Sequence, residues 1–170
     1  MPARYNYKFN LNEIFEIAEQ IERNGADFYR KAALKFEDNL EVKSLLIELA
    51  VQEDKHEKTF SNILRKVLKS DGINFADELT CQYLDVIAGQ FVFDKSQTKK
   101  ELINEMSQQN VFDIAIQKEK DSIVFYVGLK NTLISSQDKK SIDLIIREEQ
   151  KHLVDLIQYA EILRYKDERF

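Results

Sequence analysis

Hydrophobic residues recur at alternating intervals of three and four along four long stretches of the chain. This spacing places them on one face of an α-helix. Asn10 is the expected N-cap of the first helix, and Ser135-Ser136 is the expected cap region of the last. The predicted helices run from about Leu11 to Phe36, Glu41 to Lys69, Gln108 to Lys130 and Gln137 to Asp167.

The loops inside the first and second pairs of helices are short, which predicts two antiparallel helical hairpins. A longer connection, about residues 70–106, joins the hairpins. We expect it to contain a short helix near Ala76 to Ile87 and another that opens with the capping box Thr98-x-x-Glu101. Because this connection can cross the length of a bundle, the pattern predicts an all-α four-helix bundle with one long crossover.

The two predicted hairpins also resemble each other in sequence. NGADFY (24–29) corresponds to DSIVFY (121–126), and EDKH (53–56) corresponds to EQKH (149–152). This internal repeat predicts that the hairpins share one design and are related by a pseudo-twofold axis.

Each predicted helix interrupts its apolar face with a glutamate near its middle. In the second and fourth helices a histidine follows that glutamate three residues later. Because all four faces point to one core, the sequence predicts a single buried polar layer. Its members are Glu22, Glu53, His56, Glu119, Glu149 and His152.

Four buried carboxylates cannot stay ionised without compensation, since an unpaired buried carboxylate costs several kcal/mol. No Lys or Arg lies on these helix faces, but two divalent cations would balance the charge. The Glu-x-x-His spacing lets one helix offer an oxygen and a nitrogen to the same metal. Oxygen-rich ligation with one imidazole per metal favours two iron ions, with manganese as the alternative, over structural zinc.

Other polar residues near this layer admit more than one interpretation. Glu148 lies four residues before His152, but the repeat and the spacing select Glu149 as the ligand and place Glu148 on the surface. Tyr29 and Tyr126 each follow a proposed glutamate ligand by two helical turns. Each could donate a hydrogen bond to a ligand or act as a redox-active phenol. The alternative is that both are ordinary core tyrosines.

Composition narrows the class of protein further. The chain has 170 residues, which predicts a single domain over 1–170. Its net charge of −5 includes no basic block, so neither nucleic acid nor an anionic membrane is an expected partner. No apolar run is long enough to span a membrane and the N-terminus lacks a signal-peptide core, so we expect a soluble, cytoplasmic protein. Cys81 is the single cysteine, which excludes an internal disulfide or a thiolate iron centre.

These motifs resemble a known family. The segments IAEQIERNGADFY, LAVQEDKH, IQKEKDSIVFY and REEQKH are similar, in this order, to the rubrerythrin-like branch of the ferritin-like superfamily. The resemblance covers nearly the whole chain. It implies a di-iron bundle that reacts with hydrogen peroxide or dioxygen and forms a homodimer. The ligands it implies are Glu22, Glu53, His56, Glu119, Glu149 and His152.

The chain departs from that family pattern in two respects. A C-terminal rubredoxin domain with four cysteines is expected to be absent, which implies that electrons come from an external donor protein. The position of an additional glutamate, one turn after Glu119, holds Ser122, which weakens the case for a peroxidase that depends on that carboxylate.

Three functions therefore stay open at the level of sequence. The leading one is a di-iron oxidoreductase of the peroxidase or ferroxidase type. The second is iron binding for storage or delivery, and the third is a metal-free bundle in which the polar layer fixes helix register.

Overall fold

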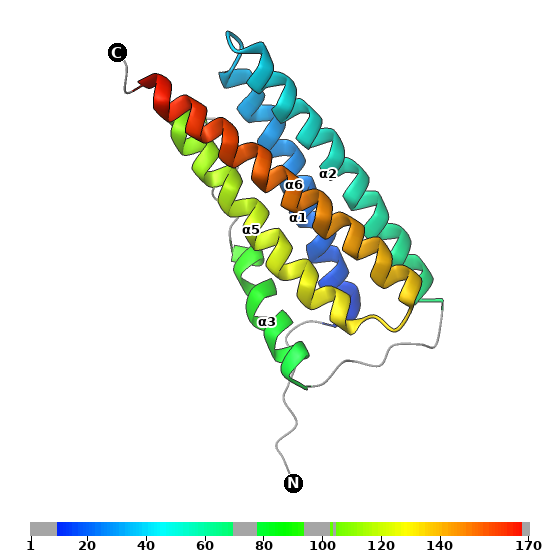
Figure 1. The fold of residues 1–170 in the computed structure, drawn as a ribbon. Coiled ribbons are helices and arrows are strands. Elements are labelled where there is room, and N and C mark those ends of the chain that lie inside the picture. The colour runs from blue at the N-terminus through cyan, green and yellow to red at the C-terminus, as the bar shows by residue number, and fades with distance from the viewer. Residues whose placement is uncertain (1–9, 70–77, 94–102, 104, 168–170) are drawn as a thin grey trace.

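The computed structural model describes residues 10–69, 78–93, 103 and 105–167, and its regular elements there are all α-helices (Figure 1). The four long helices begin and end within a residue or two of the predicted positions. None of the described helices combines the length and apolarity that a membrane crossing requires. The elements are α1 (Leu11–Lys35), α2 (Leu40–Val67), α3 (Glu78–Phe93), α5 (Gln108–Thr132) and α6 (Ser136–Asp167).

The long helices form the predicted bundle of two hairpins (Figure 1). α1 packs along α2 and α5 packs along α6, while contacts between α1 and α5 and between α2 and α6 join the pairs. α2 ends at one end of the bundle and α5 begins at the other (Figure 1). The prediction of a four-helix bundle with one long crossover is confirmed.

Side-chain caps fix where the helices begin. Asn10 accepts a hydrogen bond from the Glu13 backbone (3.0 Å), and the Glu13 carboxylate accepts one from the Asn10 backbone in return (2.6 Å). This capping box confirms Asn10 as the predicted N-cap. At the start of α6, Ser135 Oγ accepts from the Asp138 backbone N–H (3.2 Å), as the predicted cap region requires.

The helix α3 lies inside the long connection and packs on α5 and α1. It confirms the short helix predicted near 76–87 but extends to Phe93; the helix predicted at Thr98-x-x-Glu101 lies outside the described residues. Tyr83 of α3 donates to the Val124 carbonyl of α5 (2.8 Å). A Cβ on Gly128 would lie 2.5 Å from the Tyr83 ring, so this close approach requires glycine.

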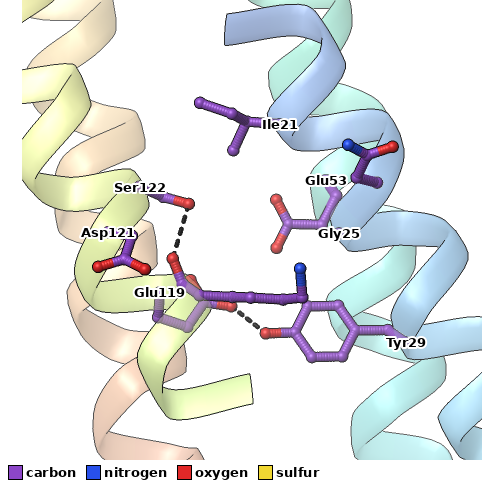
Figure 2. Close-up of a pocket in the computed structure, with 9 residues that line it drawn as sticks. Ile21, Gly25, Tyr29, Glu53, Glu119, Asp121 and Ser122 are labelled. Carbon is purple, nitrogen blue, oxygen red and sulfur yellow. Dashed lines mark hydrogen bonds between the residues drawn. The ribbon is translucent and has the colours of Figure 1, made fainter. Parts of the chain in front are cut away.

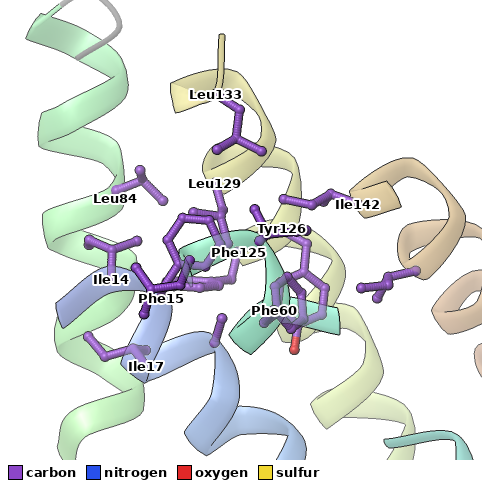
Figure 3. Close-up of a cluster of buried hydrophobic side chains, with 14 of the residues drawn as sticks. Ile14, Phe15, Ile17, Phe60, Leu84, Phe125, Tyr126, Leu129, Leu133 and Ile142 are labelled. Carbon is purple, nitrogen blue, oxygen red and sulfur yellow. The ribbon is translucent and has the colours of Figure 1, made fainter. Parts of the chain in front are cut away.

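Two apolar clusters fill the bundle, one on each side of the polar layer. One of them, here called the Phe60 cluster, includes Phe15, Phe60, Phe125, Leu129 and Ile142. Figure 3 shows this cluster, to which α3 adds Leu84. The Phe36 cluster centres on Phe28, Phe36, Leu46, Phe112 and Leu156.

Candidate metal centre

All six residues of the predicted polar layer meet inside the bundle, between the two apolar clusters. Each is at most 4% exposed. Each lies on the inward face of its helix because it occupies a position of the apolar repeat. The helix α1 contributes Glu22, α2 contributes Glu53 and His56, α5 contributes Glu119, and α6 contributes Glu149 and His152.

The six side chains form two overlapping groups. One group contains Glu22 and His56, the other contains Glu119 and His152, and both contain Glu53 and Glu149. Within each group, one potential ligand atom from every residue lies within 4.8 Å of the others. Two adjacent positions that share two carboxylates are the geometry expected for a dinuclear site.

The two histidines present the same ring nitrogen to this interior. His56 Nδ1 lies 2.8 Å from Glu149 Oε1, 3.5 Å from Glu53 and 3.6 Å from Glu22. His152 Nδ1 lies 2.9 Å from Glu149 Oε2 and 3.7 Å from Glu53 and Glu119. The rings stack with centroids 5.9 Å apart and an interplanar angle of 22°. Each group therefore includes one inward-facing Nδ1.

Several of these buried atoms have no hydrogen-bond partner. They are Glu22 Oε2, both carboxylate oxygens of Glu149, His56 Nδ1 and His152 Nδ1. Buried polar atoms are seldom left unpaired, so this convergence of lone pairs requires a cation or protons. Carboxylate oxygens with one imidazole nitrogen per position suit iron or manganese, so the residues fit a dinuclear metal.

Without a metal, protons must neutralise the layer. Burial, followed by the neighbouring Glu53 carboxylate, raises the pKa of Glu22 well above its ordinary value. Burial and Glu149 raise the pKa of Glu119 to about 8. Burial alone lowers the pKa of His152, but the nearby Glu119 and Glu149 carboxylates outweigh burial and raise that pKa to about 10. A bound cation would replace these protons.

The two tyrosines connect the hairpins crosswise. The Tyr29 hydroxyl of α1 donates a hydrogen bond to Glu119 of α5, and the Tyr126 hydroxyl of α5 donates to Glu22 of α1. Burial and the adjacent glutamates raise the pKa of both phenols well above 10, so each keeps its proton and stays a donor. Each tyrosine therefore orients a glutamate of the opposite hairpin rather than the one on its own helix.

A cavity of about 50 Å³ reaches the layer from between α1 and α5 (Figure 2). Glu53 and Glu119 form its inner wall, and Gly25 and Ser122 face each other across it. A Cβ on Gly25 would lie 3.4 Å from Glu53 Cγ, so the missing side chain leaves this space open.

The residues that contact the Nε2 atoms of the two histidines were not predicted from the sequence to have this role. Glu148, expected on the surface, has a side chain 56% exposed, yet its Oε2 lies 2.6 Å from His56 Nε2. Gln52 Oε1 lies 2.7 Å from His152 Nε2. The repeat contains a signal for both, because each is a polar residue directly before a shared glutamate.

The bundle and its buried carboxylate-histidine layer define a protein of the ferritin-like class. The rubrerythrin family model matches residues 13–158, and the chain therefore belongs to the rubrerythrin family. It is similar to the crystal structure of a Thermotoga maritima protein described as ferritin-like and diiron-carboxylate. That match has 28% identity and a TM-score of 0.67, and it covers 92% of this chain and 98% of the other. A search of curated proteins gave no match.

Proposed function

We propose that this chain is a di-iron carboxylate oxidoreductase that reduces hydrogen peroxide or dioxygen with electrons from a separate donor protein. The observation that carries this proposal is the convergence of unpartnered, buried ligand atoms from four helices on two overlapping positions. The rubrerythrin family match and the diiron-carboxylate relative support it. Two bound iron ions would supply the redox chemistry, namely the two electrons that cleave the oxygen–oxygen bond of a peroxide.

The protein's own side chains hold and orient the site. Glu53 and Glu149 belong to both positions, so each would help to hold the metal at either position. Glu22 and Glu119 each belong to one position, and tyrosine hydroxyls hold their outer oxygens. With every helix anchored by an apolar cluster, the ligands keep their spacing when charge at the site changes.

The cavity beside Glu119 supports a small oxidant. A space of about 50 Å³ accommodates a molecule the size of water, hydrogen peroxide or dioxygen. A bulky organic hydroperoxide would need more space than this. We therefore propose this cavity as the route by which the oxidant enters.

One observation favours iron handling as a second candidate function. Ser122 takes the position of an additional carboxylate one turn after Glu119, and its hydroxyl donates to the Lys118 carbonyl of its own helix (2.9 Å). Among the residues that the structure describes, the two groups therefore contain four glutamates and two histidines and no further anionic ligand. Such a set also suits oxidation of Fe(II) before iron is stored or delivered.

We further propose iron as the working metal, with manganese as the alternative. The remaining proposals are a homodimer as the working form, a cytoplasmic location, and no interaction with nucleic acid or membrane. The net charge of −5 is consistent with the last of these.

Cycling of the loaded protein distinguishes the two functions. The chain is loaded anaerobically with two Fe(II) per chain, oxidised with hydrogen peroxide and then reduced, while its absorption spectrum and iron content are followed. Repeated cycles without iron loss are expected for the oxidoreductase. Uptake far beyond two irons per chain would instead identify an iron-storage protein.

A further inference from the structure

The two halves of the metal site have matching ligands, but residues around the ligands differ, including those at the outer side of each histidine. Glu22 corresponds to Glu119 and Tyr126 to Tyr29, while both halves share the other two glutamates. The partners of the histidine Nε2 atoms differ, however. His56 contacts a carboxylate and His152 contacts an amide.

The carboxylate of Glu148 defines the state of His56. A carboxylate offers acceptors only, so His56 Nε2 donates its proton to Glu148, and a bound metal would take the place of the proton on Nδ1, which faces the interior. A charge-assisted hydrogen bond of this kind is stronger than one to a neutral acceptor and makes the ring a more basic ligand. It also adds a negative charge to the surroundings of one metal position.

The amide of Gln52 fixes the ring of His152 without adding charge. Gln52 Nε2 donates to Glu48 Oε1 (3.3 Å), which leaves Gln52 Oε1 to accept from His152 Nε2 (2.7 Å). On the Nε2 side of His152, the Glu48 carboxylate is therefore connected to the ring through a neutral amide. The residue that corresponds to Glu48 in the other hairpin is Leu144, which is 62% exposed.

We infer that Glu148 and Gln52 make the two metal positions unequal, so that the position with His56 binds a divalent cation more tightly than the position with His152. Both are positioning residues, since each acts through a histidine. The inference rests on the proposed metal site but not on its reaction with an oxidant. Replacing the hydrogen-bond partner of a ligand typically changes metal affinity by about tenfold or more.

Anaerobic titration with Co(II), followed by its ligand-field absorption, tests this inference. His152→Ala leaves the position with His56, and His56→Ala leaves the position with His152. We expect the dissociation constant for Co(II) to be about tenfold lower in His152→Ala. Glu148→Gln, added to each, should bring the two constants together.

Exchanging the two partners is the sharper test, because a purely structural role would not reverse the order of affinities. In the background of Gln52→Glu plus Glu148→Gln, the position with His152 should become the tighter one. Equal affinities in the two single-histidine variants, or a difference that Glu148→Gln leaves unchanged, would overturn the inference.

The native ligand set provides a second measurement if a histidine variant fails to fold. Glu148→Gln alone should weaken binding of the first Co(II) by about tenfold. Glu161→Gln removes the same charge from an exposed site on the same helix and should leave that affinity unchanged. The inference is wrong if neither Glu148→Gln nor Glu161→Gln weakens Co(II) binding, or if both weaken it. If the wild-type chain binds no Co(II), the proposed metal function itself fails.

Discussion

The four long helices carry both the polar layer and most of the Phe60 cluster, about one helical turn apart, yet the layer and the cluster affect the folded state in opposite ways. The cluster removes apolar surface from water and stabilises the bundle. The layer buries four carboxylates and two imidazoles, several of whose atoms have no partner. Burying unpaired polar groups costs free energy, so the layer lowers the stability of the metal-free fold. The apolar clusters hold the helices in place so that this unfavourable arrangement persists.

The largest effect on stability should come from the cluster. Phe60 is fully buried, with its ring centroid 4.7 Å from that of Tyr126, so Phe60→Ala leaves a cavity between α2 and α5. We expect the free energy of unfolding to fall by about 3–5 kcal/mol, measured by urea denaturation of the metal-free protein. Leu144→Ala, at an exposed position of α6, is the control and should change it by less than about 0.5 kcal/mol.

The contribution of the polar layer to the stability of the fold should instead depend on pH and on bound metal. The folded-state pKa values of Glu119, about 8, and His152, about 10, lie above their ordinary values. Protons bound to these two residues therefore stabilise the metal-free fold. This stabilisation is complete below the ordinary pKa values and is lost as the pH rises through about 8 for Glu119 and about 10 for His152. A cation replaces these protons, so its stabilisation should grow with pH by up to about 1.4 kcal/mol per pH unit for each proton released.

Urea denaturation with and without Mn(II) at pH 6 and pH 8 measures this effect. The stabilisation by Mn(II) should be larger at pH 8. An equal stabilisation at both values would mean that binding releases no protons, contrary to the electrostatics of the layer.

The fold itself could be predicted from the sequence because helix periodicity and short hairpin loops depend on local pattern. The six candidate ligands could be predicted because the internal repeat shows which polar residues replace apolar ones. Contacts across the bundle could not be predicted this way. Whether Glu148 reaches His56, or Tyr126 reaches Glu22, depends on how the two hairpins are rotated and spaced relative to each other. That rotation follows from packing of side chains in both clusters, not from any single helix.

Tyr126 belongs to the Phe60 cluster and also donates a hydrogen bond to Glu22 of the polar layer, so a substitution there separates the two contributions. Tyr126→Phe keeps the ring in the Phe60 cluster but leaves Glu22 without its donor. We expect a loss of about 1–3 kcal/mol in stability and about tenfold in metal affinity, measured by urea denaturation and Co(II) titration. Tyr159→Phe is a matched control, because Tyr159 also donates to a glutamate, Glu41, but at the surface (2.8 Å). An equal effect of both substitutions on metal affinity would contradict this role.

The smallest effect should come from the wall of the cavity. Gly25→Ala places a methyl group 3.4 Å from Glu53 Cγ, which is an ordinary contact. We expect the metal-free protein to gain about 0.5–1 kcal/mol, since alanine favours the helix. The methyl group narrows the cavity, so oxidation of loaded Fe(II) by hydrogen peroxide should slow, as measured by stopped-flow absorption. Ser122→Ala removes an oxygen from the opposite wall and should not slow it. Unchanged oxidation in Gly25→Ala would mean that the oxidant enters elsewhere.

The metal content of Glu53→Gln plus Glu149→Gln, compared with the wild-type chain, tests the central claim most directly. Both proteins are purified without chelators and their iron and manganese are measured by mass spectrometry. The account predicts two metal ions per wild-type chain and a loss of most of that metal in the variant, because these two glutamates belong to both positions. Circular dichroism should show that the variant keeps its helices. A folded variant with the same metal content as the wild type, or a wild-type chain that neither contains nor binds metal, would contradict it.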